Sequence, residues 1–159
     1  MASASHRRIR VVHVDDESAF TQLTRTFLER EDGAISVETA TSADDSLELI
    51  ADHPPDCVVS DYDMPGTDGI EFLRAVREDH PDLPFILFTG KGSEEVASDA
   101  ISAGATDYLQ KQAGTEQYGL LANRIRNAVT QHRSEKQLQR THTEYSAVFE
   151  NAQNGLLLV

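Results

Sequence analysis

Short apolar runs alternate with amphipathic segments over the first 112 residues of this chain. Between the runs, apolar residues recur every three or four positions, as in Phe20, Leu23, Phe27 and Leu28, which predicts helices. Strands that alternate with helices are typical of right-handed crossovers and a parallel sheet. We therefore expect an α/β fold with a doubly wound, five-stranded parallel sheet, (βα)5. The expected strands lie within residues 9–14, 35–37, 57–59, 85–88 and 108–109.

The helical spacing continues past the last expected strand, and its character changes along the way. Tyr118, Leu121 and Ile125 step by three and four residues, as one face of a helix that packs on the sheet would. Beyond Arg133 the segment is mostly polar, with a sparse apolar stripe that includes Leu138. We expect an extended C-terminal helix that leaves the domain as a linker. It is either solvated as a single helix or paired with a second copy in a homodimer.

The charge balance excludes several classes of function. The chain has 27 acidic and 14 basic side chains, a net charge of -13. This argues against a surface that binds nucleic acid or anionic lipid, because such surfaces require clustered Lys and Arg. No apolar run approaches the roughly 18 residues of a membrane span, and no signal peptide is visible, so we expect a soluble, cytoplasmic protein. An acidic, lysine-poor chain is similar in composition to proteins of extreme halophiles. The single cysteine, Cys57, excludes an internal disulfide and a Cys-based zinc site.

Polar side chains follow four of the expected strands within two positions. Asp15 and Asp16 follow the first, Asp61 the third, Thr89 the fourth and Lys111 the fifth. Ligands of an open parallel sheet bind beyond the carboxyl ends of its strands, so these side chains are expected to converge. Two carboxylates ~4 Å apart repel by about 4 kcal/mol at an effective dielectric of about 20, so the cluster must raise pKa values or hold a cation. Oxygen ligands suit Mg²⁺, and the lysine and hydroxyl indicate phosphate chemistry.

Four motifs at these strand ends occur in the order and spacing of a known family. With them, the sequence resembles the receiver domain of two-component response regulators over residues 9–130. The resemblance implies a flavodoxin-like fold and a role in phosphorelay signalling. The motifs occupy residues 14–17, 60–69, 88–90 and 107–111.

The resemblance implies a role for each of these side chains. Asp61 is expected to be the phosphoacceptor, which takes a phosphoryl group from the phosphohistidine of a histidine kinase or phosphotransfer protein. Asp15, Asp16 and Asp61 would bind Mg²⁺ together with the backbone carbonyl of Asp63. Lys111 would contact a phosphoryl oxygen.

The resemblance also implies a switch that responds to phosphorylation. Thr89 would move its hydroxyl toward the phosphate, and Tyr108 would change from an outward to an inward rotamer. This would alter the surface formed by the fourth helix, fifth strand and fifth helix. The small Gly90 would leave space beside the acceptor. The chain departs from the family at Gln112, where proline is usual, so a trans Lys111–Gln112 bond is the default expectation.

The last stretch resembles the opening of a second kind of domain. Residues 145–159 look like the first helix and strand of a PAS sensor domain, which they are too few to complete. We therefore expect a flexible tail over residues 1–8, a receiver domain over 9–130 and a helical linker over 131–144. PAS or other output domains would follow in a longer protein.

Two other functions stay open. Asp61 and Asp63 have the spacing of nucleophile and acid/base in a phosphatase of the haloacid dehalogenase type. In that type the lysine and an acidic pair follow the nucleophile, whereas here Asp15 and Asp16 precede it. A receiver-like scaffold that binds partners without phosphorylation is the third interpretation. On the favoured interpretation the chain is not a turnover enzyme, although it would catalyse its own phosphorylation and dephosphorylation.

Overall fold

The computed structural model describes residues 7–90 and 93–155, with side chains described as far as residue 140. The chain divides into two units, one that ends at Val129 and one that begins at Thr130. The strands are β1 (Ile9–Val14), β2 (Ile35–Ala40), β3 (Cys57–Ser60), β4 (Phe85–Thr89) and β5 (Asp107–Gln110). The helices are α1 (Ser18–Glu31), α2 (Ala43–Asp52), α3 (Gly69–Asp79), α4 (Glu94–Ser102) and α5 (Glu116–Gly155).

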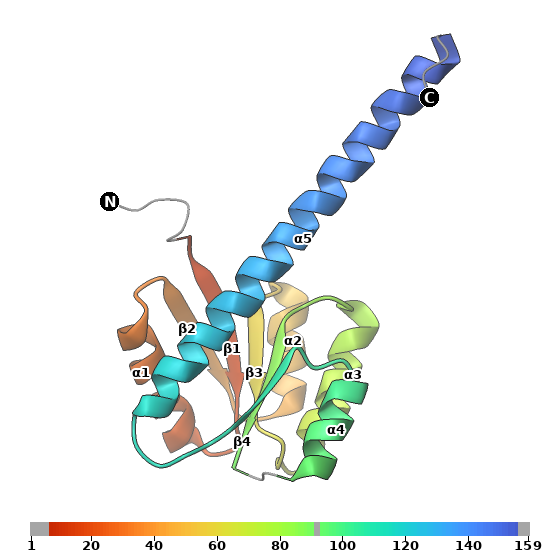
Figure 1. Cartoon of the computed structure of the whole chain (residues 1–159). Helices are drawn as coiled ribbons and strands as arrows, with labels where there is room; N and C mark the ends of the chain where they lie inside the picture. Colours follow the sequence, from red (N-terminus) through yellow and green to blue (C-terminus); the bar gives the residue numbers. More distant parts are fainter. Residues whose placement is uncertain (1–6, 91–92, 156–159) are drawn as a thin grey trace. The chain divides into compact units, whose positions relative to one another are not determined.

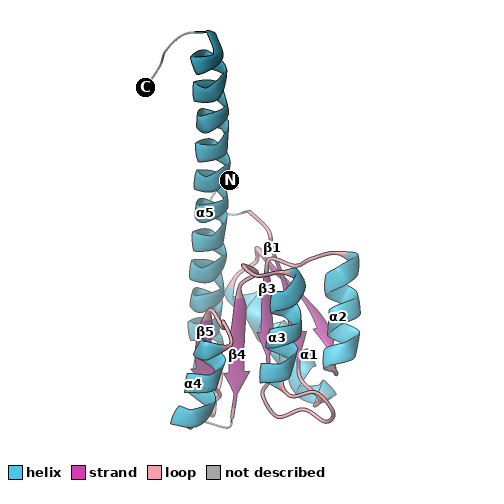
Figure 2. Ribbon diagram, turned by 90° about the vertical axis from the view of Figure 1, so that its right-hand side faces the viewer, coloured by secondary structure: helices cyan, strands magenta, loops and turns pink. Residues whose placement is uncertain are grey.

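The five strands form one parallel sheet in the order β2-β1-β3-β4-β5. Helix α1 and the first part of α5 cover one face, and α2, α3 and α4 cover the other (Figure 1, Figure 2). The predicted doubly wound α/β fold is confirmed. The strand order reverses between β1 and β3, because the chain moves outward from β1 to β2 and then returns to the other side of β1. The crevice beyond the carboxyl ends of β1 and β3 is where such a sheet binds its ligand.

The core consists of two apolar clusters, one on each face of the sheet. In β1, Val11 belongs to the cluster under α1 and α5, whereas Val12 and Val14 belong to the cluster under α2, α3 and α4. Successive side chains of a strand point to opposite faces, so a strand buried on both faces is apolar throughout. This explains why β3 and β4 were visible in the sequence as apolar runs, whereas β1 also carries Arg10 and the buried His13.

Helix α1 packs on the sheet through most of the apolar residues that recur at helical spacing. Leu28 is buried, and Phe20 and Phe27 are partly buried against the core, whereas Leu23 is 46% exposed. The residues that are buried are Thr21, Thr24 and Leu28, which are also spaced by three and four positions. Threonine methyl groups can fill a helix–sheet interface, so the packing of α1 on the sheet also buries polar residues that the apolar pattern did not indicate.

Side-chain caps start three of the helices. Ser42 and Ser93 each accept a hydrogen bond of 3.1 Å from the backbone nitrogen three residues on. Helix α3 has a capping box that the sequence analysis did not identify. Its Asp68 side chain accepts from the Glu71 nitrogen at 2.8 Å, and the Glu71 side chain accepts from the Asp68 nitrogen at 3.0 Å. These bonds satisfy amide groups that a helix start otherwise leaves unpaired.

The extended C-terminal helix is confirmed as α5. Within the first unit, Tyr118, Leu121 and Ile125 are buried, as their spacing predicted, and Val129 is buried as well. Within the second unit, Leu138 is 69% exposed. No helix among the described residues is both long enough and apolar enough to cross a membrane.

Candidate functional site

Three predicted carboxylates come together at the crevice between β1 and β3. Val14 and Ser60 are register partners in these adjacent strands, so the aspartates that follow them leave the sheet side by side. Asp15, Asp16 and Asp61 each offer one carboxylate oxygen, and these oxygens all lie within 4.8 Å of one another. Asp15 and Asp61 are buried, whereas Asp16 is exposed.

Lys111 follows the edge strand β5, and its side chain extends past the end of β4 to this cluster. Its backbone nitrogen donates to the Thr89 carbonyl at 2.8 Å, which extends the ladder between β4 and β5 to the site. Its Nζ donates to Asp15 Oδ2 at 2.7 Å and lies 3.5 Å from Asp61 Oδ2. One ammonium therefore partly balances two buried carboxylates.

Burial raises the pKa of the Asp61 carboxyl above its usual value, and the neighbouring Asp15 charge raises it further. Lys111 acts in the opposite direction, as do hydrogen bonds from the Thr89 side chain and the Tyr62 nitrogen. The net result is a carboxylate whose negative charge is incompletely compensated. Such a group gains from a cation or from any reaction that removes its charge.

The backbone around Asp61 is packed too tightly for a side chain at Gly69. A Cβ at this position would collide with the Asp61 carbonyl and would lie 2.8 Å from the Tyr62 Cα. The Gly69 nitrogen also donates to the Tyr62 carbonyl at 2.8 Å. The start of α3 is thereby fixed against the segment that carries Asp61. Gly69 ends the motif over residues 60–69, and the sequence alone did not reveal why a glycine is required there.

The other residues predicted for the site lie at or near the ends of β4 and β5. Thr89 is buried and hydrogen-bonds to Asp61. Tyr108 is partly buried against the cluster under α2, α3 and α4. A Cβ at Gly90 would meet nothing within 4 Å, consistent with open space beside the acceptor. The described residues include no cis peptide bond, so the Lys111–Gln112 bond is trans as expected.

Two residues near the site were missed by the sequence analysis. His13 in β1 is fully buried, and its pKa is lowered to about 4, mainly by desolvation. The Asp15 charge raises this pKa and the Lys111 charge lowers it, so the imidazole is neutral at pH 7. Phe20 in the first turn of α1 places its ring centroid 4.2 Å from Lys111 Nζ. The signal for Phe20 was its position one helical turn after Asp16, at the beginning of the helix that follows the acidic pair.

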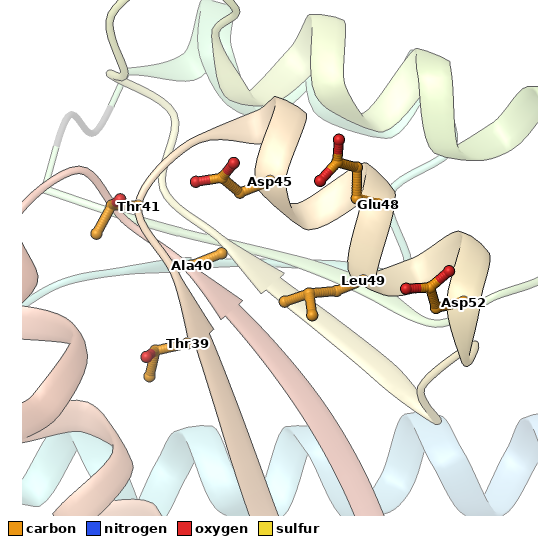
Figure 3. A pocket seen from close by; sticks show the side chains of 7 residues that line it. All are labelled: Thr39, Ala40, Thr41, Asp45, Glu48, Leu49 and Asp52. Carbon is orange, nitrogen blue, oxygen red and sulfur yellow. The ribbon is translucent and has the colours of Figure 1, made fainter.

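A separate pocket of about 350 Å³ lies between the end of β2 and helix α2 (Figure 3). Its lining includes the carboxylates of Asp45, Glu48 and Asp52. None of the predicted site residues contributes to this lining. The carboxylate cluster at β1 and β3, rather than this pocket, therefore holds the chemistry that the sequence predicted.

The family model of the response regulator receiver domain matches residues 11–122. The chain belongs to this family. Response regulator MprA of Mycobacterium sp. (strain KMS) is 37% identical over 109 residues, which cover 69% of this chain and 46% of that protein. The chain thus spans less than half the length of this relative.

Solved structures of receiver domains have the same fold. A receiver domain protein from Clostridium thermocellum has a TM-score of 0.70 at 28% identity, over 79% of this chain and 97% of that one. The NtrX structure from Brucella abortus has a TM-score of 0.73 at 30% identity, over 83% of this chain and 30% of that one. This receiver domain is a signalling module of the two-component type. The phosphatase and scaffold alternatives are not favoured by these similarities.

Proposed function

We propose that Asp61 is the phosphoacceptor of this receiver domain and that a histidine kinase or phosphotransfer protein is its donor. The observation that carries the proposal is the convergence of Asp15, Asp16 and Asp61 with Lys111 at the crevice where the strand order reverses. In the transfer, an Asp61 oxygen forms a bond to phosphorus while the bond from phosphorus to the donor imidazole nitrogen breaks. The imidazole leaves with the electron pair of the broken bond.

The carboxylate cluster fits Mg²⁺. Its donors are hard oxygen atoms, and the compact arrangement of three carboxylates leaves more negative charge than Lys111 balances. Asp15, Asp16, Asp61 and the backbone carbonyl of Asp63 would hold the ion. Bound Mg²⁺ neutralises charge on the phosphoryl oxygens. The raised pKa of Asp61 supports this assignment, because an adjacent cation would relieve the cost of its ionised form.

Lys111 and Thr89 would bind the transferred phosphoryl group. The Lys111 ammonium is already 3.5 Å from Asp61 and retains N–H groups beyond the one that it donates to Asp15. The Thr89 hydroxyl would exchange its bond to Asp61 for one to a phosphoryl oxygen. Tyr108 would then move inward from its partly buried position and alter the surface formed by α4, β5 and α5.

The phosphorylated state would end by hydrolysis at the same site. Water attacks the phosphorus, the bond to the Asp61 oxygen breaks, and inorganic phosphate leaves with the carboxylate restored. Each such cycle needs a new phosphoryl donor, so the domain acts as a timed switch rather than as a turnover enzyme for a diffusible metabolite.

In a longer protein, we propose that the receiver (residues 9–130) acts through the linker helix (131–144) on PAS or other output domains. The segment similar to a PAS domain, 145–159, lies entirely outside the described side chains. Residues 1–6 of the expected tail and residues 156–159 lie outside the described residues. A homodimer through α5, a cytoplasmic location and a halophilic source stay predictions. Sedimentation of chains that end at Thr130 and at Val159 tests the dimer, and two monomers would contradict it.

Phosphorylation stoichiometry tests the main proposal. The chain is incubated with acetyl phosphate and Mg²⁺ in high salt, quenched rapidly, and its intact mass is measured. We expect one added phosphoryl group, which a chelator prevents and Asp61→Asn abolishes. Asp63→Asn, which changes an exposed neighbouring carboxylate, should still accept one group. An unmodified wild-type chain, or a modified Asp61→Asn chain, would contradict the assignment of Asp61.

A further inference from the structure

The ammonium of Lys111 contacts aromatic rings as well as carboxylates. Its Nζ lies 4.2 Å from the centroid of the Phe20 ring and 6.0 Å from that of Phe88. Both distances are within the roughly 6 Å over which a cation is attracted to a ring face. The Lys111 side chain is 18% exposed, so this contact is partly shielded from water and stronger than one on an open surface.

Lys111 needs such a support because its two carboxylates attract it unequally. Asp15 holds the ammonium at 2.7 Å, whereas Asp61 is 3.5 Å away. A lysine stem has four flexible methylenes, and its ammonium reorients readily among acceptors. The Phe20 ring occupies the space beside the ammonium and so limits where the ammonium can move. This restriction would keep the ammonium within reach of Asp61, although Asp15 binds it more closely.

The Phe20 ring is itself fixed by aromatic neighbours. Its centroid lies 6.0 Å from that of His13 and 6.2 Å from that of Phe88. Phe88 is fully buried and lies 6.5 Å from Tyr118 of α5. The ring that faces Lys111 thus belongs to a packed aromatic row between the sheet, α1 and α5, and its orientation is determined by the core.

We propose that Phe20 is a positioning residue for phosphoryl transfer, whose ring holds the Lys111 ammonium between Asp15 and Asp61. The inference rests on the proposed role of Asp61 and adds a residue that does not touch the phosphoryl group. It requires a ring with an electron-rich face at position 20. Apolar bulk alone would fill the space and would not attract the ammonium.

Substitutions at position 20 separate these requirements. Phe20→Leu should lower the maximal rate of phosphorylation by acetyl phosphate about 10-fold, the size of a partly buried cation–π contact. Phe20→Tyr keeps the ring and should stay within about 2-fold of wild type. Mg²⁺ affinity, measured by calorimetry, should change little in either variant, because the carboxylates are untouched. Phe27→Leu is the matched control, since Phe27 lies in the same helix and stacks on Tyr118 without a contact to Lys111.

Two further measurements distinguish cation–π attraction by the Phe20 ring from the effect of its side-chain shape. Replacement of Phe20 by phenylalanines of increasing fluorine content should lower the logarithm of the rate stepwise, because fluorine weakens the ring face and barely alters its size. The ε-methylene protons of Lys111 should show an upfield ring-current shift in NMR spectra that Phe20→Leu removes. A flat fluorine series, or a Phe20→Leu rate equal to that of Phe27→Leu, would overturn the inference. If the wild-type chain shows the expected upfield shift of Lys111 and yet accepts no phosphoryl group, the proposed role of Asp61 would be overturned instead.

Discussion

Lys111 donates a 2.7 Å hydrogen bond to Asp15, which lies 96 positions earlier in the chain. Strands β3 and β4 separate the two strands that carry these residues, so the lysine side chain spans the crevice. The Asp15 side chain is fully buried, and the pair also borders Asp61. The same ammonium that stabilises the carboxylates in the absence of metal is therefore the group proposed to bind the phosphoryl oxygens.

Lys111→Met should affect phosphorylation and metal binding in opposite directions. Loss of the ammonium removes a proposed contact to the phosphoryl group, and we expect the phosphorylation rate to fall about 100-fold. The ammonium also competes with Mg²⁺ for Asp15 and Asp61, so its loss should tighten Mg²⁺ binding and enlarge the rise in Tm that Mg²⁺ causes. Quenched-flow mass measurements and thermal melts with and without Mg²⁺ test both effects. Lys136→Met removes an exposed lysine of α5 and should leave both quantities unchanged.

Asp61→Asn should stabilise the fold when Mg²⁺ is removed by a chelator. The pKa of Asp61 is raised from its usual 3.8, so the folded state pays for ionisation at neutral pH, a cost that the amide avoids. The gain, about 0.5–2 kcal/mol, should be present at pH 7 and fade as pH falls through the raised pKa. Urea unfolding at several pH values measures it. A less stable variant at pH 7, with Asp63→Asn unchanged, would show that burial of the charge is compensated elsewhere.

His13 should make the fold sensitive to mild acid. Its folded pKa of about 4 lies below the usual 6.5, so the unfolded chain binds a proton first as pH falls. Stability from this group is complete above pH 6.5 and is lost toward pH 4, by up to about 3 kcal/mol for a shift of this size. His13→Phe should flatten this part of the curve of unfolding free energy against pH. His53→Gln, at an exposed position, should leave the slope as it is, and an unchanged slope in both would refute the prediction.

Gly69→Ala should damage both the fold and the site. The added methyl group would collide with the Asp61 carbonyl and press on the Tyr62 backbone, with a cost of about 2–4 kcal/mol. Gly33→Ala is the control, because a Cβ there meets nothing within 4 Å. Chemical unfolding measures the difference, and acetyl phosphate labelling of the folded fraction shows whether Asp61 has moved. Equal stabilities would mean that the α3 start shifts without cost.

The parts of the site that could be predicted follow from local rules. Asp15, Asp61 and Lys111 were identified because each comes within two positions after an apolar run, and the carboxyl ends of parallel strands meet at one edge of a sheet. No local rule placed Phe20 under Lys111. Their contact depends on the rotation of α1 about its axis, and the sequence pattern had assigned Phe20 only to an apolar helix face.

The sequence by itself determined the succession of strands and helices along the chain and the residues at the strand ends, because these depend on side-chain period and chain direction. Only the tertiary structure decided how elements met. It extended β2 through the polar Glu38 and Thr39, since each residue of this strand pairs in register with β1. It also turned Thr21 and Thr24 inward and enclosed His13. Burial of this kind depends on which two surfaces pack together, and the two surfaces come from segments that are far apart in the chain. A local sequence pattern therefore cannot predict it.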